Sequence, residues 1–179
     1  MKATGIVRRI DDLGRVLITK EIRRTMRIRE GDPLEIYTDR DGEVIFKKYS
    51  PIGEMSAFAT QYTETLHKIC SMSVVITDRD SVIASAGVPK KEYTDRKLTS
   101  DFEGIMNQRG LYSSKNGDPV FIVEGASANV KYAMPIVTEG DVVGCIACLS
   151  SSSDSQSDEA TEAKLIQTAA SFLGKQFEG

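Results

Sequence analysis

The stretch GRVLITKEIRRTMRIREGD, residues 14–32, decides how the N-terminal part of this chain folds. Its segment Arg15–Thr19 is aliphatic and β-branched and favours a short strand. Thr19 can cap a helix that runs from Lys20 to about Met26. The Gly-Asp-Pro that follows ends any continuation, because proline has no amide hydrogen and restricts the residue before it. We therefore expect a strand followed by a helix of barely two turns.

A first hairpin is expected around this strand. Ala3–Ile10 reads as its partner, and the two runs are separated by the turn-forming residues 11–14. Asp11 and Asp12 have the composition of a catalytic carboxylate pair, but adjacent acids beside a glycine are typical of turns. We interpret both as structural residues.

A second hairpin follows the helix. Leu34–Thr38 and Glu43–Lys48 flank Asp39–Gly42, where the glycine supplies the positive φ of a tight turn. A segment of about fifty residues with such thin strands lies near the limit at which one chain can bury enough core. We therefore expect an intertwined dimer and predict that the first domain spans residues 1–50.

The two ends of the chain differ in charge. The chain has 179 residues and a formal net charge of −3. Residues 1–29 hold nine Lys and Arg against three acids, a net charge of +6. A solvated face would balance such charges with ion pairs, and Glu21 and Glu30 are too few to do so. The planar fork of arginine grips phosphate oxygens or the O6/N7 edge of guanine. Double-stranded DNA is the expected partner, and an RNA- or protein-binding adaptor is the alternative.

Four consecutive motifs carry a resemblance to a known family. They are Gly5-Ile6-Val7-Arg8, Leu13-Gly14-Arg15-Val16, Glu21-Ile22-Arg23-Arg24-Thr25 and Leu34-Glu35-Ile36-Tyr37. In this order they resemble the AbrB family of bacterial transition-state regulators. The resemblance implies a swapped-hairpin β-barrel formed by two chains, a DNA-binding surface on both protomers, and control of sporulation genes.

The resemblance also implies which residues contact DNA. By their position in the motifs these are Arg8, Arg15, Arg23 and Arg24. Charge alone adds Lys2, Arg9 and Lys20 as phosphate partners, which set affinity without reading the base sequence. These seven residues form the predicted site, for which we expect no cofactor and no metal.

Thr19 departs from the family pattern, which usually has proline at this position. Proline would fix φ just before the helix. Thr19 can instead accept an amide hydrogen bond as an N-cap, worth about 1 kcal/mol. We therefore expect the helix to form and to aim its arginines similarly.

The second domain is predicted to span residues 51–179 and to begin with a linker helix over about 52–71. Apolar residues recur along that helix at spacings of three and four: Ile52, Met55, Ala59, Tyr62, Leu66 and Ile69. Strands are expected at 73–77, 82–86, 120–123, 129–137 and 142–149, with helices at about 95–108 and 158–177. This order indicates an α+β chain whose helices flank an antiparallel sheet, and it resembles a GAF domain.

Two roles remain open for the second domain. A GAF-like fold can enclose a pocket for an unidentified small-molecule ligand. In the alternative, the amphipathic helices at 52–70 and 158–177 pair across protomers and join barrel dimers into homotetramers. The stripe of the last helix, with Leu165, Ala169, Phe172 and either Gln176 or Phe177, suits packing within one chain or between chains.

His67, Cys70, Cys145 and Cys148 together have the composition of a structural zinc site. Cys145 and Cys148, however, lie in an apolar strand pattern of period two, which sends residues three apart to opposite faces. We interpret the cysteines as buried hydrophobic residues with reduced thiols. The sequence contains no phosphate-binding loop, zinc-protease motif or nucleophile elbow, so we do not expect an enzyme.

The sequence gives no sign of a membrane partner. Its longest apolar run lies within Val142–Leu149 and is far shorter than the roughly 20 residues that a span requires. Nothing resembles a signal peptide. We expect a cytoplasmic protein that associates with the nucleoid.

Overall fold

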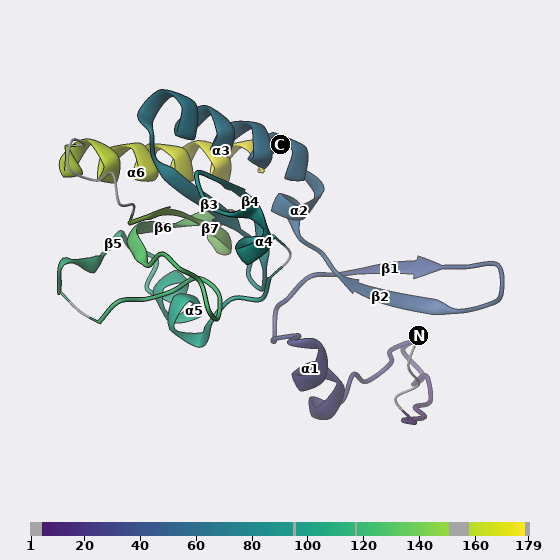
Figure 1. The fold of residues 1–179 in the computed structure, drawn as a ribbon. Helices are drawn as coiled ribbons and strands as arrows, with labels where there is room; N and C mark the ends of the chain where they lie inside the picture. Colours follow the sequence, from purple (N-terminus) through teal and green to yellow (C-terminus); the bar gives the residue numbers. More distant parts are fainter. Residues whose placement is uncertain (1–4, 95, 117, 151–157, 178–179) are drawn as a thin grey trace. The chain divides into compact units, whose positions relative to one another are not determined.

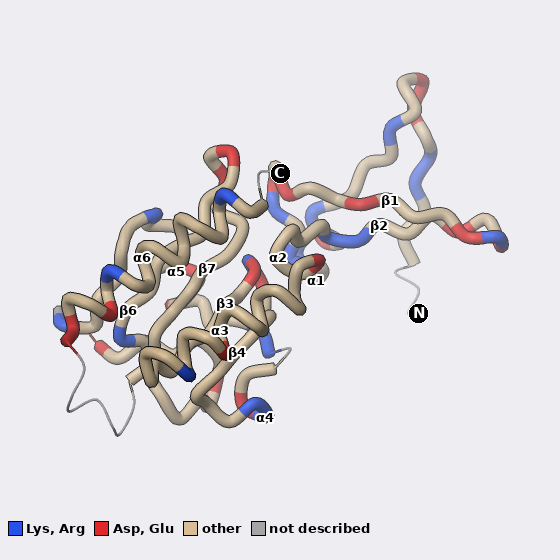
Figure 2. The backbone as a smooth tube through the Cα atoms, turned by 90° about the horizontal axis from the view of Figure 1, so that it is seen from above, with Lys and Arg blue, Asp and Glu red and all other residues tan. Residues whose placement is uncertain are grey.

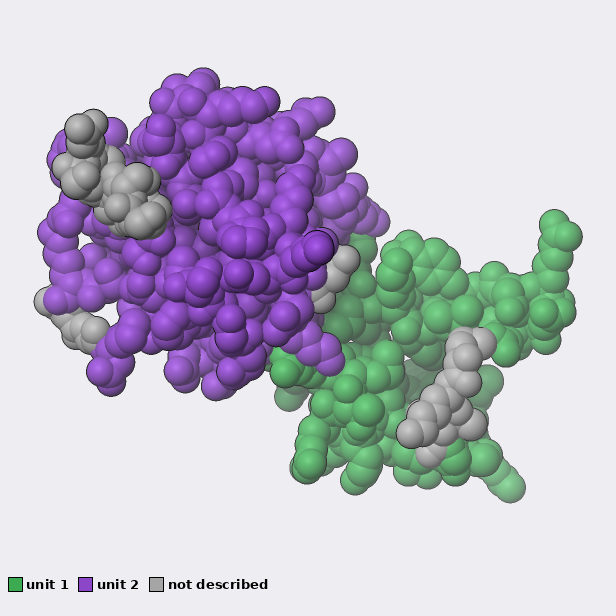
Figure 3. All heavy atoms as spheres, in the orientation of Figure 1, with its two compact units in different colours: residues 1–49 green, residues 50–179 purple. Residues whose placement is uncertain are grey.

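The computed structural model describes residues 5–94, 96–116, 118–150 and 158–177 (Figure 1). The chain divides into two compact units, residues 1–49 and 50–179, which are coloured separately in Figure 3. No described helix is long and apolar enough to cross a membrane.

The first unit contains one helix and one hairpin. Helix α1 spans Lys20–Met26, and strands β1 (Leu34–Thr38) and β2 (Val44–Lys48) pair antiparallel. Both were expected from the sequence and are confirmed. The turn between the strands is built by Asp39, whose Oδ1 accepts the amides of Asp41 and Glu43 at 3.0 and 2.8 Å.

The first predicted hairpin is wrong for a single chain, because the described residues 5–19 form no strand. Only its turn is closed, by a hydrogen bond of 3.0 Å from the Asp11 amide to the Arg15 carbonyl. Val7 and Leu17 on the two sides of the turn are 85% and 72% exposed. Strands of this kind need a core to pack on, and one chain supplies none here.

The second unit begins with two helices instead of the single linker helix that we predicted. Helix α2 spans Pro51–Glu54, and α3 spans Ser56–Cys70. The Ser50 Oγ accepts the Gly53 amide at 3.0 Å and caps α2. Met55 breaks the helix with φ −98° and ψ 27°. The apolar spacing continues across the break, so periodicity could not reveal it.

The sheet of this unit is antiparallel throughout, with the strand order β4-β3-β7-β6-β5. Its strands are β3 Ser73–Thr77, β4 Val82–Ala86, β5 Tyr112–Ser113, β6 Val130–Thr138 and β7 Asp141–Leu149. The helices are α4 Lys90–Tyr93, α5 Ser100–Asn107 and α6 Glu159–Gln176, with a short 3-10 turn at Ser114–Asn116. The α+β class and the antiparallel sheet are confirmed.

The strand predicted at 120–123 is wrong. Ile122 and Val123 are fully buried, but the segment forms no strand of the sheet, and its one β-bridge, between Leu98 and Val123, is isolated. The edge position beside β6 is taken by β5. Burial in a core and membership of the sheet leave the same apolar signature in the sequence.

Two hydrophobic cores lie on opposite faces of the sheet. Helices α3 and α6 cover one face, and α5 lies on the other, as Figure 1 shows. Cys148 belongs to the first core and Cys145 to the second. The predicted alternation is therefore confirmed, and these two thiols cannot converge on one metal ion. Burial raises the pKa of the Cys145 thiol far above its usual value.

Gly144 of β7 lies where the sheet leaves no room for a side chain. A Cβ atom at this position would overlap the carbonyl oxygen of Thr77 and meet the Ile52 Cδ1 at 2.5 Å. The Thr77 backbone and the buried Ile52 side chain have no room to move away from an added Cβ atom. Gly104 in α5 has nothing within 4 Å of the same position.

We predict that Gly144→Ala lowers the free energy of unfolding by about 1–3 kcal/mol or more, because the added methyl overpacks the core. Gly104→Ala should raise it by about 0.5–1 kcal/mol, since alanine is the better helix former. Chemical denaturation of both variants measures the difference. A Gly144→Ala variant as stable as the parent would contradict the described packing.

Candidate nucleic-acid interface

The predicted basic residues lie in two groups of the first unit, whose positive charges are marked in blue in Figure 2. Arg8, Arg9 and Arg15 lie in the segment around the turn, and all three are exposed. Lys20, Arg23 and Arg24 lie on α1, with the two arginines in its last turn. Lys2 lies outside the described residues.

Arg15 is held in place by Asp11. One carboxylate oxygen of Asp11 accepts the amides of Leu13 and Arg15 at 3.1 and 2.7 Å, and the other accepts Arg15 Nε at 2.8 Å. The Arg15 backbone and side-chain hydrogen bonds hold the Asp11 pKa below its usual value. The Arg15 side chain is still 70% exposed. Asp11 is thus a turn residue, as predicted, and it also positions one of the candidate arginines.

Thr19 starts α1 without the cap that we predicted. Its φ is −67° and its ψ is 161°, and its side chain accepts no amide hydrogen bond at the helix start. The φ already has the value that proline would impose. The pKa of Glu21 in the first turn lies below its usual value, first because its own amide donates to the carboxylate and also because Arg8 is near.

The C-terminal end of α1 is tied to β2. The Lys48 Nζ donates to the Arg27 carbonyl at 2.9 Å and lies 3.5 Å from Asp32 Oδ2. Asp32 also accepts the amide of Arg29 at 2.8 Å. These contacts fix the end of α1 that carries Arg23 and Arg24. Sequence reasoning missed Asp32 and Lys48, because a salt link across sixteen residues leaves no local pattern.

Arg23 is half-buried, unlike its neighbour Arg24. Its Nε is buried and has no hydrogen-bond partner within the described part of the chain. A buried donor without a partner is costly, and native structures rarely leave one. The Arg23 Nε is therefore a buried donor left unsatisfied among the described residues.

The first unit also leaves most of its apolar side chains uncovered. Ile28 is its only buried hydrophobic residue among those that the structure describes. The exposed ones include Val7, Ile10, Leu13, Leu17, Ile36 and Val44, each between 57% and 85% exposed. A folded unit does not leave this much apolar surface in water.

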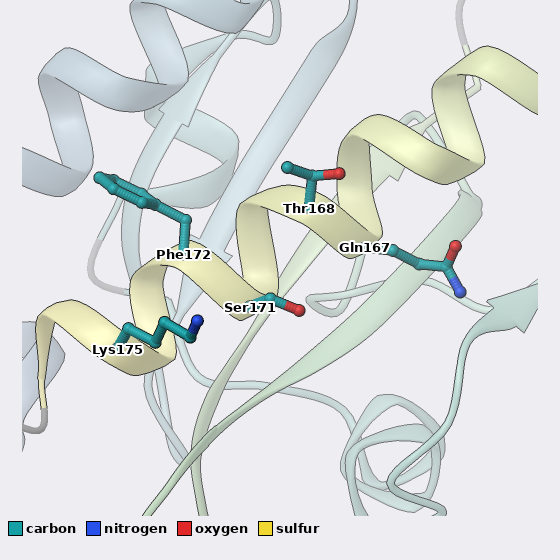
Figure 4. A pocket seen from close by; sticks show the side chains of 5 residues that line it. All are labelled: Gln167, Thr168, Ser171, Phe172 and Lys175. Atoms are coloured by element: carbon teal, nitrogen blue, oxygen red, sulfur yellow. The ribbon is translucent and has the colours of Figure 1, made fainter.

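A second candidate surface lies on the outer side of α3 and α6. A groove of about 420 Å³ on α6 is lined by Gln167, Thr168, Ser171, Phe172 and Lys175 (Figure 4). The ring centroid of Phe172 lies 6.2 Å from that of Phe58 and 5.8 Å from that of Tyr62, both of which are on α3. Phe172 is 41% exposed, and Ile69 further along α3 is 77% exposed.

The apolar stripe predicted for α6 is only partly confirmed. Ala169 is buried, but the buried side of the helix continues through Ile166, Ala170 and Leu173. Phe172 lies on the neighbouring side and stays partly exposed. Ile69, which was placed on the stripe of the first helix, is likewise exposed. These two helices therefore carry more apolar surface than one chain covers.

The zinc hypothesis finds no support in the geometry. His67 is engaged locally, with its Nδ1 2.9 Å from the carbonyl oxygen of Met72. Cys145 and Cys148 lie in different cores. No group of three or more His, Cys, Asp or Glu residues suited to a metal ion occurs within residues that the structure describes.

Comparison with known proteins identifies the family of the chain. The model of the stage V sporulation protein T C-terminal domain, described as a transcription factor, matches residues 54–178. The chain is also 49% identical to stage V sporulation protein T of Bacillus subtilis (strain 168) over 180 aligned residues, which cover 99% of each chain. The chain belongs to the stage V sporulation protein T family.

The N-terminal unit has relatives of its own. Residues 7–53 match the model of the antidote-toxin recognition protein MazE, a bacterial antitoxin. The transition state regulatory protein AbrB of Bacillus subtilis is 61% identical over 51 residues, which are 28% of this chain and 52% of AbrB. The resemblance to the AbrB family read from the four motifs is thereby confirmed.

The second unit shares its fold with a more distant structure. A methyl-accepting chemotaxis protein, residues 122 to 287, aligns with a TM-score of 0.52 and 17% identity. The alignment covers 69% of this chain and 88% of that chain, and it shows similarity of fold alone. The likeness to GAF domains stays a prediction.

The geometry of Thr19 yields a prediction for the family proline. We expect Thr19→Pro to raise the free energy of unfolding by about 0.4–1 kcal/mol, because φ is already suitable and the unfolded chain loses freedom. The amide of Thr19 donates no hydrogen bond to any described residue, so the substitution removes none. Denaturant titration measures the change.

Thr25→Pro is the matched control, since Thr25 lies inside α1. Proline there breaks the helix and should destabilise by about 3 kcal/mol. Destabilisation by Thr19→Pro as well would show that the start of α1 differs from its description.

Proposed function

We propose that the protein is a homo-oligomeric, DNA-binding regulator of transcription in sporulation and not an enzyme. Its N-terminal domain, residues 1–50, binds double-stranded promoter DNA in the cytoplasm, at the nucleoid. The observation that carries this proposal is the basic surface of residues 1–29, with its net charge of +6, in a domain related to AbrB. An acidic second domain, residues 51–179, modulates or assembles it.

The N-terminal domain folds, in this proposal, as a swapped-hairpin barrel formed by two chains. Val7, Ile10 and Leu17 are exposed on one segment, and Ile36 and Val44 on the hairpin. A second chain would cover these side chains and allow residues 5–19 to form strands. Burial of apolar area contributes about 25 cal/mol per Å², which makes pairing favourable.

Each protomer of the barrel contributes the same basic residues. Arg8, Arg15, Arg23 and Arg24 contact DNA, where the arginine fork pairs with guanine or with phosphate. Lys2, Arg9 and Lys20 neutralise phosphates. The Arg15 side chain is preorganised because it donates a hydrogen bond to Asp11. The end of α1 that carries Arg23 and Arg24 is fixed by the hydrogen bond from Lys48 to the Arg27 carbonyl. Preorganised side chains lose less freedom on binding.

The second domain has two proposed roles. The exposed aromatic face of α3 and α6, with Phe172 and its groove, joins two barrel dimers into a tetramer. A GAF-like fold, in addition, suits the sensing of an unidentified small molecule. The exposed Phe172 and Ile69 favour the assembly role, since exposed apolar patches mark interaction surfaces.

Binding to an AT-rich duplex over a series of salt concentrations tests the DNA assignment. Log affinity should fall linearly with log salt, by about 0.9 for each phosphate neutralised. The full chain with Arg8, Arg15, Arg23 and Arg24 changed to alanine should bind about a hundredfold more weakly or worse, with a much flatter slope. Duplex RNA of the same sequence serves as the competitor.

The matched control changes Lys90, Lys91, Lys97 and Lys164, all exposed in the second unit, to alanine. It removes the same charge and should leave DNA binding nearly unchanged. Equal affinity of the arginine variant and the parent would reject the proposed surface. Stronger binding to RNA than to DNA would favour the adaptor instead.

Phe172→Lys tests the assembly role of the second domain. A charge in the aromatic cluster should convert tetramers into dimers, halving the mass seen by sedimentation, because an unpaired charge cannot be buried cheaply. Phe121→Lys is the control, since Phe121 is 37% exposed elsewhere in the same unit. An unchanged mass for Phe172→Lys would remove this face from the assembly.

A further inference from the structure

Arg27 has a backbone conformation that arginine rarely adopts. Its φ is 52° and its ψ is 35°, in the left-handed region, directly after the last helical residue of α1. The Arg27 amide donates to the Arg24 carbonyl at 3.3 Å, and the Ile28 amide donates to the Arg23 carbonyl at 2.8 Å. This pair of hydrogen bonds defines a Schellman motif, in which glycine is the favoured residue at the left-handed position.

Several contacts hold Arg27 in this conformation. Ile28, the residue that follows, is 8% exposed and anchors the chain after the motif. The Arg27 carbonyl accepts the Lys48 Nζ at 2.9 Å, and Lys48 pairs in turn with Asp32 at 3.5 Å. The backbone at Arg27 is therefore fixed from both α1 and β2, and its exposed side chain starts from a rigid base.

The other left-handed residues besides glycine have local explanations. Glu139 lies beside Gly140 in the tight turn between β6 and β7. Arg109 uses its side chain to bond the Gly140 carbonyl at 2.8 Å. Ser71 has a small side chain and ends α3. Arg27 instead places a long cation within four residues of Arg23 and Arg24, at the same end of α1.

We infer that Arg27 is a further DNA-contacting residue, which binds a backbone phosphate from a strained but fixed position. The inference rests on the proposed function. Strain of this kind persists where the surroundings overdetermine it, and such residues gather at functional sites. A left-handed residue points its side chain differently from a helical one, so Arg27 reaches a phosphate beside those that Arg23 and Arg24 contact. Its role is affinity and not base recognition.

The experiment compares three variants of the full chain at a temperature at which each is folded. Arg27→Gly relieves the strain and should raise the midpoint of thermal unfolding by about 2–4 °C. The same variant should bind duplex DNA about tenfold more weakly, and its salt slope should be flatter by about 0.9 for each phosphate that it no longer neutralises. A gain in stability together with weaker DNA binding is a result that a structural role would not produce.

The variants Arg27→Gln and Arg27→Lys separate the effect of the side-chain charge on DNA binding from the effect of the backbone conformation. Gln keeps the side-chain length without the charge and should lose affinity like Gly, whereas Lys keeps the charge and should bind nearly as the parent does. The inference is overturned if Arg27→Gly or Arg27→Gln binds DNA with the affinity of the parent. It is also overturned if Arg27→Lys loses as much DNA affinity as Arg27→Gln does. Ser71→Gly makes the same backbone change in the second unit and should leave DNA affinity unchanged.

The two proposals fail in different ways. If the parent chain does not bind duplex DNA, the proposed function is wrong. If the parent binds and the change of Arg8, Arg15, Arg23 and Arg24 abolishes binding while Arg27→Gly and Arg27→Gln do not weaken it, only the role of Arg27 is wrong.

Discussion

The N-terminal unit cannot cover its own apolar side chains, and this constraint governs the rest of the structure. Ile28 is buried, whereas Val7 and Leu17 stand largely in solvent, and the described residues 5–19 form no strand. Apolar surface of this extent is removed from water in a stable protein. We propose that a second copy of the chain covers it, which also doubles the basic surface and gives it two-fold symmetry.

Local hydrogen bonds then determine how the arginines are presented. Asp11 holds Arg15 from its own turn, and Lys48 holds the end of α1 through the Arg27 carbonyl. The first contact fixes the Arg15 guanidinium, and the second fixes the backbone at Arg27. Both arginine side chains stay exposed. A surface of this kind suits a partner with regularly spaced negative charges, such as duplex DNA. The acidic second unit keeps the positive charge confined to one region of the chain.

Sequence reasoning succeeded where a local signal decides the structure. Asp39 and the glycine of its turn predicted the hairpin β1–β2, and period-two spacing placed Cys145 and Cys148 on opposite faces. Sequence reasoning failed where the structure depends on contacts with residues far away in the sequence or in another chain. The strands of the first hairpin need a core that one chain lacks, and Ile122 and Val123 are buried although their segment forms no strand of the sheet.

The candidate site shows the same division. Composition and motifs were enough to propose the arginines, because charge is visible in the sequence. The link from Lys48 to Asp32 and the left-handed backbone of Arg27 were not visible, since each depends on how α1 meets β2. The missing cap at Thr19 is a further case, in which the residue type allowed a hydrogen bond that the geometry does not make.

Isotope-filtered NMR on the full chain tests the two-chain barrel most directly. Methyl-labelled protein is refolded together with unlabelled protein, and contacts between labelled and unlabelled chains are recorded. We predict intermolecular contacts from the methyl groups of Val7 and Leu17 to Ile36 or Val44. Contacts confined to one chain at these positions would contradict a core that two chains share.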